Sequence, residues 1–472
     1  MTEQQAIEMV RDALAGDEVW LVGGVVRDRI LGRSPGGRVD IDLVTAGDAG
    51  QAARKIAERV DRGVAVFPLS DEFGSWRVSG ADGSWQVDCT PIQGGSLEQD
   101  LLARDLTVNA IAERLDGGSL IDPSGGVSDL ERRTLRMPGP NVFEADPLRA
   151  VRLARFTVQL GFEPDASAVA AARKAAAGLD LVAGERIYSE FNAILASADP
   201  VGGIRMLDDC GVSGVILPEL QLLKGIDQTA YHHLDAYEHT LEVLQNSADM
   251  QSDAAAYVGS ALGPRVAQVL NEELADEMTR ATALRWGALL HDIAKPQTRT
   301  EFSDGRIGFP EHAAQGAVQA RTILERFRAS EKVRAHVAKL TKEHLRLGFL
   351  VHERPLGRSH LYRYMIDCRP VEVDVTLLSL ADRHATRGRK SEEAIALHGE
   401  IGEQVLVAAL DWRSGGPPEP LYRGDLLARD LGIATGPKIG ELLDAIQEAQ
   451  YCGEVTTRPQ ALELAEGLLG GL

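Results

Sequence analysis

The strand-forming segments of this 472-residue chain are confined to roughly its first third, and this segregation constrains the fold more than any other feature. Between Val19 and about Leu135, short runs of β-branched and aromatic residues are broken by glycines. These runs are Trp20–Val22, Val39–Leu43, Val64–Phe67, Trp76–Val78 and Trp85–Val87. With helical patches between them, they predict a small α/β domain built on a mixed sheet.

After Asp146 the strand signals fade, and the remainder of the chain is typical of helices. Stretches rich in alanine and leucine, such as Ala168–Ala177 and Leu284–Ala294, have the spacing of amphipathic helices. The predicted fold class is therefore α+β, with an N-terminal α/β head followed by an all-helical remainder. Glycine and proline cluster at 138–140, 198–203 and 413–420. We expect four domains, at 1–140, 141–225, 226–400 and 401–472.

Composition excludes several classes of protein. Hydrophobic residues make up 44% of the chain and charged residues 25%, and no stretch approaches the roughly 18 apolar residues of a membrane span. The first residues lack the basic and apolar segments of a secretory signal, which predicts a cytoplasmic protein. The four cysteines lie far apart without a CxxC pair, which argues against a disulfide framework and a cysteine-built zinc site.

The net charge of -20 would repel nucleic acid unless basic residues are concentrated locally. Two segments fulfil that condition, one between Arg132 and Arg155 and one between Arg326 and Arg346. Any RNA contact is expected at these segments. For the second, a solvated helix face is an equal interpretation.

A predicted strand that runs into paired glycines forms the first candidate site. Gly23 and Gly24 follow the apolar run that ends at Val22, and Arg27 lies early in the helix expected after them. Such a turn lets backbone N–H groups approach a polyphosphate, and an arginine adds a charged fork. Taken alone, a plain strand-to-helix turn is the commoner explanation of paired glycines.

Two aspartates on the next predicted strand are candidate metal ligands near the glycine turn. In the run from Val39 to Leu43, alternation places Asp40 and Asp42 on one face. Like charges at that spacing are costly unless a cation lies between them, as in Mg²⁺-dependent phosphoryl transfer. Asp88, at the end of another strand, is a candidate third acid. For either strand an exposed acidic edge is the alternative.

Five segments in order carry a family resemblance: Gly23–Gly24 with Asp40-x-Asp42, Arg104–Ala110, Ile121–Leu130, Asp146–Phe156 and Glu185–Glu190. Together they resemble the class II tRNA nucleotidyltransferases, the family of CCA-adding enzymes and bacterial poly(A) polymerases. Arg104–Ala110 is similar to the family's RRDFTINA motif, and Asp146–Phe156 resembles the segment that recognises the incoming base. The resemblance covers about the first 190 residues.

The resemblance implies a role for each matching residue. It assigns Asp40 and Asp42 to Mg²⁺ and to catalysis, with Asp88 as the third acid suggested by alternation. It assigns the nucleotide to Gly23, Gly24, Arg27, Arg104, Asp105 and Asn109, and its Watson–Crick edge to Asp146 and Arg149. Residues 1–140 would then be the nucleotidyltransferase head and 141–225 a helical neck for base recognition and RNA binding.

Helical spacing adds two arginines to the predicted nucleotide-binding residues. The sequence also departs from the family pattern at two positions. Arg152 and Arg155 follow Arg149 at intervals of three, so they share its helix edge and can reach phosphates or RNA. Asp146 directly before a proline is also a typical helix cap. Ala103 and Ala145 stand where the family usually has an arginine and an acid, which blurs which nucleotides are accepted.

Histidines accumulate beyond residue 230 and form a second candidate site. His239, the adjacent His291 and Asp292, and later Asp382 follow in the order of the HD superfamily of metal-dependent phosphohydrolases, which this region resembles. His312 and His344 are further candidate ligands. Histidine ligands suit a transition metal better than Mg²⁺. For any single histidine a structural role is the alternative, and Asp382 could simply pair with Arg383.

The resemblances together predict a Mg²⁺-dependent enzyme that adds CMP, CMP and AMP from CTP and ATP to tRNA 3′ ends without a template, with pyrophosphate leaving. Alternatives are a poly(A) polymerase, an enzyme that adds only CC or A, or an HD phosphohydrolase acting on nucleotides or RNA 3′ ends. Residues 226–400 would be the HD domain and 401–472 a helical tail. The expected partners are tRNA, CTP and ATP, with no membrane and no obligate protein partner.

Overall fold

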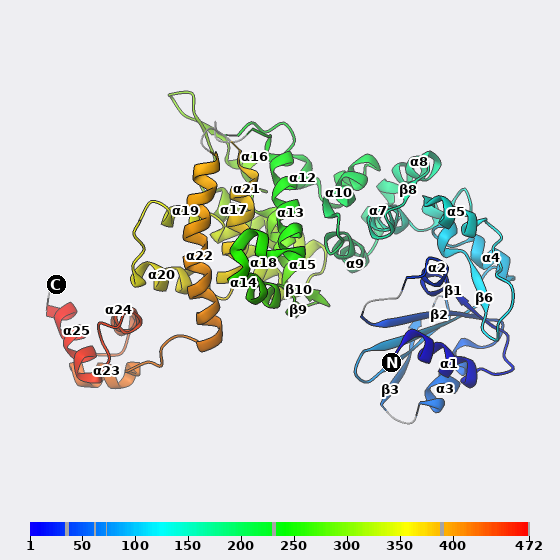
Figure 1. Ribbon diagram of the computed structural model, residues 1–472, viewed down its shortest axis with the longest axis horizontal. Helices are drawn as coiled ribbons and strands as arrows, with labels where there is room; N and C mark the ends of the chain where they lie inside the picture. Colours follow the sequence, from blue (N-terminus) through cyan, green and yellow to red (C-terminus); the bar gives the residue numbers. More distant parts are fainter. Residues whose placement is uncertain (34–36, 61–62, 72, 229–232, 388–390, 471–472) are drawn as a thin grey trace. The chain divides into compact units, whose positions relative to one another are not determined.

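The computed structural model describes residues 1–472 except 34–36, 61–62, 72, 229–232, 388–390 and 471–472. The chain forms two compact units (Figure 1). The first comprises Met1–Ser197 with Gly202–Ile216, and the second comprises Ala198–Val201 with Leu217–Leu472. The finer division into four domains stays a prediction.

A six-stranded mixed sheet forms the centre of the head. Its strands are β1 (Val19–Val22), β2 (Val39–Thr45), β3 (Val64–Ser70), β4 (Ser75–Gly80), β5 (Trp85–Pro91) and β6 (Ala112–Arg114), in the spatial order β3-β4-β5-β2-β1-β6. Strands β2 and β5 run parallel, and all other neighbours run antiparallel. The mixed sheet and its five predicted strands are confirmed. Strand β6 was not predicted, because its residues, Ala112–Arg114, include no β-branched or aromatic side chain.

Helices cover both faces of this sheet. They are α1 (Glu3–Ala13), α2 (Gly24–Ile30), α3 (Ala49–Arg59), α4 (Leu97–Leu102) and α5 (Gly126–Arg132), with a 3₁₀ turn at Thr107–Asn109. Helix α3 packs on α1 and contacts β3, β4 and β5. On the opposite face, α4 buries two leucines against Trp20, Val22 and Val44. Since Asp40 and Asp42 alternate with the apolar residues of β2, they share the face of Val44.

Helices follow the head in the first unit: α6 (Val142–Ala145), α7 (Leu148–Leu160), α8 (Ala166–Ala175), α9 (Gly184–Leu195), α10 (Pro200–Asp209), whose first two residues are assigned to the second unit, and α11 (Ser213–Ile216). Helix α7 packs against α8 and α9 and supplies most of its apolar side chains to the core. The Asp165 carboxylate caps α8 by accepting a hydrogen bond from Ala168 N at 2.7 Å. A two-residue pairing of β7 (Thr134–Leu135) with β8 (Glu163–Pro164) ties this region to α5 and α7.

The second unit is built of helices around a buried centre. They are α12 (Pro218–Gln221), α13 (Ala236–Ser252), α14 (Ala254–Leu270), α15 (Arg280–Leu290), α16 (Lys295–Thr298), α17 (His312–Arg326), α18 (Glu331–Glu343), α19 (Arg346–Leu350), α20 (Arg358–Cys368), α21 (Glu372–Ala385) and α22 (Ser391–Gly415). Two short hairpins, β9 (Glu273–Ala275) with β10 (Met278–Thr279) and β11 (Thr300–Glu301) with β12 (Ile307–Gly308), interrupt the helices.

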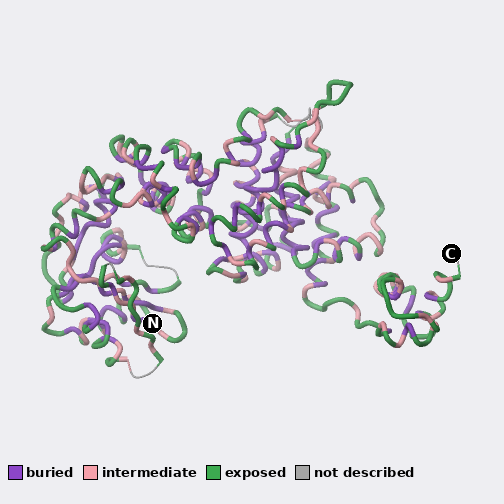
Figure 2. The backbone as a smooth tube through the Cα atoms, turned by 180° about the vertical axis from the view of Figure 1, so that it is seen from behind, coloured by how far each residue is buried: buried purple, intermediate pink, exposed green. Residues whose placement is uncertain are grey.

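Helix α15 differs from the amphipathic helix predicted over Leu284–Ala294. All eleven of its residues are buried, and in Figure 2 buried residues are concentrated in the interior of the helical part of the chain. Contacts with α13, α14, α18 and α21 surround it. A helix enclosed on all sides needs no polar face, so its periodicity carries less information than that of a surface helix.

The tail of the second unit has a small core of its own. Helices α23 (Gly424–Leu431), α24 (Pro437–Cys452) and α25 (Arg458–Gly470) bury Leu427, Leu442 and Ile446 among themselves. Helix α24 also contacts α20. Among the described residues, no helix combines the length and apolar character that crossing a bilayer requires.

Candidate functional site

Three carboxylates from two neighbouring strands meet on one face of the head sheet. Asp40 and Asp42 lie on β2, and Asp88 lies on β5 directly beside Asp42 in the parallel register. One oxygen of each lies within 4.8 Å of the others. Asp40 is exposed, whereas Asp42 and Asp88 are half-buried. The structure thus brings the three predicted acids together as an acid triad of oxygen ligands, the kind that Mg²⁺ prefers.

Each acid of the triad has its own electrostatic surroundings. Gln86 Nε2 donates a hydrogen bond of 2.9 Å to Asp40, and Arg77 donates two hydrogen bonds of 2.7 Å to Asp88. Burial, reinforced by the charge of Asp40, raises the pKa of Asp42 to about 6. A bound cation would offset the repulsion between these carboxylates. The charge distribution of the triad therefore fits a metal site.

A cavity of about 380 Å³ adjoins the triad. Its walls contain five arginines: Arg27, Arg38, Arg104, Arg152 and Arg155. Gly23 has a φ of +71°, which side-chain-bearing residues rarely adopt, and a Cβ there would lie only 3.0 Å from Asp42 Oδ2, so this turn favours glycine. Arg27 is buried and donates a hydrogen bond of 2.7 Å from Nη1 to the Asn109 side-chain oxygen. Cationic walls beside an acid triad suit a triphosphate with its metal ion.

A network of ion pairs holds two of the arginines that line this cavity. Arg152 donates hydrogen bonds of 2.8 and 2.6 Å to Asp105 and one of 2.9 Å to Glu190. Arg155 Nε lies 2.9 Å from the second carboxylate oxygen of Glu190. Although burial acts in the opposite direction, the Arg152 charge holds the pKa of Asp105 well below its usual value. The network therefore holds both arginines in place before any ligand binds.

The two residues expected to recognise the base lie outside these cavity walls as the structure describes them. The Asp146 carboxylate lies 2.8 Å from the guanidinium of Arg186 and accepts a weak hydrogen bond of 3.3 Å from Leu148 N. Arg149 Nη1 donates hydrogen bonds to the carbonyl oxygens of Val142 at 3.1 Å and Arg104 at 3.4 Å. Asp146 therefore contacts the first residue of α7, but Pro147, and not Asp146 as expected, stands at the N-cap of that helix. The role of Asp146 toward a base stays a prediction.

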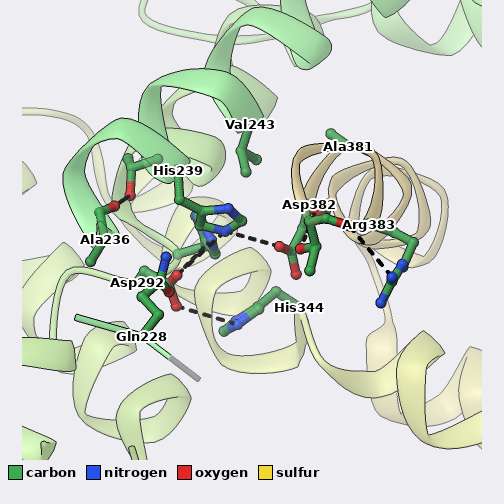
Figure 3. Close-up of polar contacts among 12 residues, drawn as sticks. Gln228, Ala236, His239, Val243, Asp292, His344, Ala381, Asp382 and Arg383 are labelled. Atoms are coloured by element: carbon green, nitrogen blue, oxygen red, sulfur yellow. Dashed lines mark hydrogen bonds and ion pairs between the residues drawn. The ribbon is translucent and has the colours of Figure 1, made fainter. Parts of the chain in front are cut away.

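The six residues predicted as HD-type ligands converge in the second unit, and we call them the HD cluster. Figure 3 shows His239, Asp292, His344 and Asp382 directed toward one another. They are His239 on α13, His291 and Asp292 directly after α15, His312 at the start of α17, His344 after α18 and Asp382 on α21. Asp292 Oδ2 lies 3.0 Å from His291 Nε2, and Asp292 Oδ1 lies 3.4 Å from His312 Nε2 and 4.0 Å from His344 Nε2. His239 Nε2 lies 3.1 Å from Asp382 Oδ1, so Asp382 pairs with this histidine and not with Arg383.

Backbone carbonyls orient three of the histidines. The Nδ1 atoms of His291, His312 and His344 lie 2.8, 2.7 and 2.7 Å from the carbonyl oxygens of the residues three positions earlier. Because a carbonyl only accepts, each Nδ1 carries the proton and each Nε2 is left as an acceptor directed into the cluster. This is the second layer of hydrogen bonds that metal-binding histidines characteristically have.

The donor set of the HD cluster fits a metal ion. His239, His291 and Asp292 form one group with ligand atoms within 4.8 Å, and Asp292, His312 and His344 form another. Asp292 belongs to both groups, so its carboxylate links the two sets of candidate ligands. Burial lowers the pKa of His344 to about 3, so this ligand is neutral at pH 7. Neutral imidazoles with carboxylates suit a transition metal.

Three sequence families match the chain. They are described as "Poly A polymerase head domain" at residues 19–136, "Probable RNA and SrmB- binding site of polymerase A" at 161–223 and "HD domain" at 236–387. An A-adding tRNA nucleotidyltransferase of Deinococcus radiodurans is 37% identical over 93% of each chain. A CC-adding tRNA nucleotidyltransferase of Thermus thermophilus is 34% identical over 93% of this chain and 91% of its own.

This chain belongs to the tRNA nucleotidyltransferase family. A "Multifunctional CCA protein" of Xanthomonas campestris is a further relative, 32% identical over 90% of this chain and 96% of its own. The predicted family, enzyme class and head-to-HD architecture are thereby confirmed.

Solved structures show the same fold. A CCA-adding enzyme in complex with ATP superimposes with a TM-score of 0.63 at 21% identity, over 99% of this chain and 95% of the other. The Thermotoga maritima CCA-adding enzyme complexed with tRNA gives a TM-score of 0.60 at 21% identity over 99% of both chains. At this identity the likeness establishes the shared tRNA nucleotidyltransferase fold.

Sequence reasoning missed three residues that the tertiary structure places at the two sites of this tRNA nucleotidyltransferase. Arg77 and Gln86 contact Asp88 and Asp40, and only the pairing of β4 with β5 and of β2 with β5 brings them there. Lys295 Nζ lies 2.5 Å from Asp292 Oδ2. Its position three residues after Asp292, one helical turn away, was a signal available in the sequence.

Proposed function

We propose that this tRNA nucleotidyltransferase adds CMP, CMP and AMP to the 3′ end of tRNA from CTP and ATP, with Mg²⁺ held by Asp40 and Asp42. The observation that carries the proposal is the acid triad at the edge of an arginine-walled cavity. Bound Mg²⁺ would activate the terminal hydroxyl and stabilise the leaving pyrophosphate. A cytoplasmic location also remains our prediction.

Different residues around the cavity bind the nucleotide and hold its binding groups in place. Arg27, Arg104 and the Gly23–Gly24 turn bind and orient the triphosphate, because they face the cavity beside the acids. Asn109 holds Arg27, and the network of Asp105 and Glu190 holds Arg152 and Arg155. Asp88 completes the acid triad, with its carboxylate oriented by Arg77.

Base choice is assigned to Asp146 and Arg149. An aspartate accepts a hydrogen bond from the exocyclic amine that C and A share, and an arginine donates to their ring acceptors. One such pair serves both bases, which favours complete CCA addition. The Asp146 contact with Arg186 is open to exchange, because the Arg186 side chain is about half exposed at 51%.

The test is a set of tRNA transcripts that end before CCA, after C and after CC. Each is incubated with Mg²⁺ and CTP, ATP or both, and the products are resolved at single-nucleotide length. CCA addition followed by a stop supports the proposal. Addition of A alone or of CC alone would contradict the proposal. These are the activities named for the Deinococcus and Thermus relatives. Long A tails would identify a poly(A) polymerase.

A second activity, metal-dependent phosphoester hydrolysis, is proposed for the HD cluster. It is favoured by the convergence of four histidines and two aspartates, with three of the imidazoles oriented by hydrogen bonds from Nδ1 to backbone carbonyls. A transition metal bound there would activate a water. The test is hydrolysis of p-nitrophenyl phosphate by the purified protein with added Mn²⁺, Ni²⁺ or Co²⁺. Absence of turnover with all three metals would refute it.

A further inference from the structure

One acid of the triad is already paired with a cation of the chain itself. Arg77 on β4 lies directly opposite Asp88 of β5 in the antiparallel register. Its Nε and Nη2 donate hydrogen bonds of 2.7 Å to Oδ1 and Oδ2 of Asp88, so both carboxylate oxygens are engaged. Such a bidentate arginine–carboxylate pair is stronger and more strictly oriented than a single hydrogen bond. In this structure the cation at Asp88 is therefore a guanidinium.

Strand alternation places this pair on the face of the sheet that carries the acids. Trp76, the residue before Arg77, contacts Arg54 of helix α3, which covers the opposite face. Arg77 thus extends to the side of Asp42 and Asp88. The side chains of Arg77 and Asp88 are only 24% and 15% exposed, so water screens their contact less than it screens a surface ion pair.

The other two acids are directed toward the nucleotide cavity. Asp40 accepts a hydrogen bond of 2.9 Å at Oδ1 from the neutral amide of Gln86, and in the described part of the chain its Oδ2 has no such partner. Asp40 and Asp42 line the cavity, whereas Asp88 and Arg77 are not among its walls as the structure describes them. Two acids of the triad therefore face the ligand, and the third faces a guanidinium.

The charges of the site lead to the same division. Three ionised carboxylates bring three negative charges, and Arg77 compensates one of them, which leaves a charge that one divalent ion neutralises. Asp88 is close enough to share an ion, because one oxygen of each acid lies within 4.8 Å of the others. Without its arginine, Asp88 would complete a ligand set for two ions roughly 3.5–4 Å apart, as in two-metal phosphoryl-transfer sites.

We propose that Arg77 takes the place of a second divalent ion at Asp88, so that the nucleotide-free head holds a single divalent ion between Asp40 and Asp42. Arg77 is then a positioning residue, because it acts through Asp88. The inference rests on the proposed function, in which Asp40 and Asp42 hold Mg²⁺. It adds that any second ion enters together with the triphosphate, whose oxygens replace the ligand that Arg77 withholds.

The experiment counts the Mn²⁺ ions bound to the full-length protein without nucleotide, by electron paramagnetic resonance. Mn²⁺ takes the same oxygen ligands as Mg²⁺. The parent chain carries Asp292→Ala, which removes the ligand common to both groups of the HD cluster. The parent chain with Asp42→Asn added gives the background that is subtracted. We expect one Mn²⁺ in the parent chain, with the spectrum of an isolated ion.

Arg77→Met should release Asp88 and admit a second Mn²⁺, seen as two bound ions with the spectrum of a magnetically coupled pair. Arg114→Met removes an exposed arginine of the same sheet that pairs with Asp116, and this matched control should still bind one ion. A single ion in the Arg77→Met chain would overturn the proposal even if it bound more tightly, because the lost charge alone would explain that. Two ions in the parent chain would overturn it as well.

A second variant does not depend on the stability of the Arg77→Met chain. Arg77→Gln combined with Asp88→Asn keeps the net charge of the pair and allows the two side chains to hydrogen-bond. We expect this double variant to bind one Mn²⁺ with a Kd within about threefold of the parent value, because Asp88 is not a ligand of that ion. A larger increase in Kd would make Asp88 a ligand and refute the proposal.

The same measurements separate this inference from the proposed function. If the parent and Arg77→Met chains both bind one ion that Asp42→Asn removes, the Mg²⁺ site stands and only the role of Arg77 is refuted. If Asp42→Asn removes no Mn²⁺ from either chain, the metal site of the head is refuted, and the inference falls with it.

Discussion

The acid triad of the head and the HD cluster both gather carboxylates where a cation fits, but their surroundings differ. The triad consists of carboxylates alone, and its outermost member, Asp40, is exposed. In the HD cluster four histidines join two aspartates, and His239, His291 and His344 are almost completely buried. Oxygen ligands open to solvent favour a hard, hydrated ion, whereas buried imidazoles favour a transition metal.

The two sites also position their ligands by different means. In the head, the parallel register of β2 and β5 sets Asp42 beside Asp88. In the HD cluster the ligands lie near helix ends, and a hydrogen bond from Nδ1 to a carbonyl three residues earlier aims each of three histidines. Strand pairing therefore supplies the geometry in one site and local backbone contacts supply it in the other. The four predictions below test whether the acid triad and the HD cluster function independently of each other.

Asp42→Ala should lower the rate of nucleotide addition by at least about 10³-fold, because it removes a central oxygen ligand of the triad. Binding of tRNA should stay near normal, and HD phosphohydrolysis should be unaffected. Asp82→Ala, an exposed acid in the head, is the matched control. Single-turnover addition and a tRNA binding assay check the result. Full activity in the Asp42 variant would show that Asp42 is not a ligand of the catalytic metal.

Asp292→Ala should abolish phosphohydrolysis and lower the bound transition metal, because both ligand groups of the HD cluster include Asp292. Nucleotide addition should be spared. Metal content and the two activities are measured in parallel, with the exposed Asp304→Ala as the control. Loss of both activities would mean that the HD cluster is structural and that the two sites are not independent.

Glu190→Gln should weaken the nucleotide site through its arginines. The substitution leaves Arg152 and Arg155 without the carboxylate that both contact at 2.9 Å. We expect a loss of about 2 kcal/mol in the free energy of unfolding and a KM for CTP raised by about tenfold. Glu185→Gln, exposed on the same helix, provides the comparison. An unchanged KM would show that the network is not needed for nucleotide binding.

Asp42→Asn should stabilise the metal-free protein at neutral pH. The pKa of about 6 lies above the ordinary 3.8, so the native state holds the proton more tightly than the unfolded chain does. This contribution to stability is present at low pH and is lost as the pH rises from about 4 to about 6. At pH 7 the neutral amide should therefore gain about 1–3 kcal/mol, with little gain at pH 4.

Urea unfolding with EDTA at the two pH values measures this effect. An equal gain at pH 4 and pH 7 would contradict the electrostatic explanation. Added Mg²⁺ should stabilise the wild-type chain and leave the Asn variant nearly unchanged, because the amide is a poorer ligand.

Much of the fold could be predicted because its signals are local. Alternation identified five strands of the head, and glycine and alternation together identified the Gly23–Gly24 turn and the pair Asp40 and Asp42. The buried helix α15 could not be characterised from periodicity, because it has no polar face. Base recognition by Asp146 and Arg149 stays a prediction, since neither side chain faces the described cavity.

The sequence by itself determined the order of the motifs and the family, and it supplied the candidate metal ligands, because motifs and ligand types are read from the residues themselves. Only the tertiary structure decided which groups meet across long separations. Asp88 joins Asp42, Arg77 holds Asp88, and Glu190 holds Arg152 because strand register and helix packing bring them together. Such contacts follow from the burial of side chains remote in sequence, which no local pattern of residues encodes.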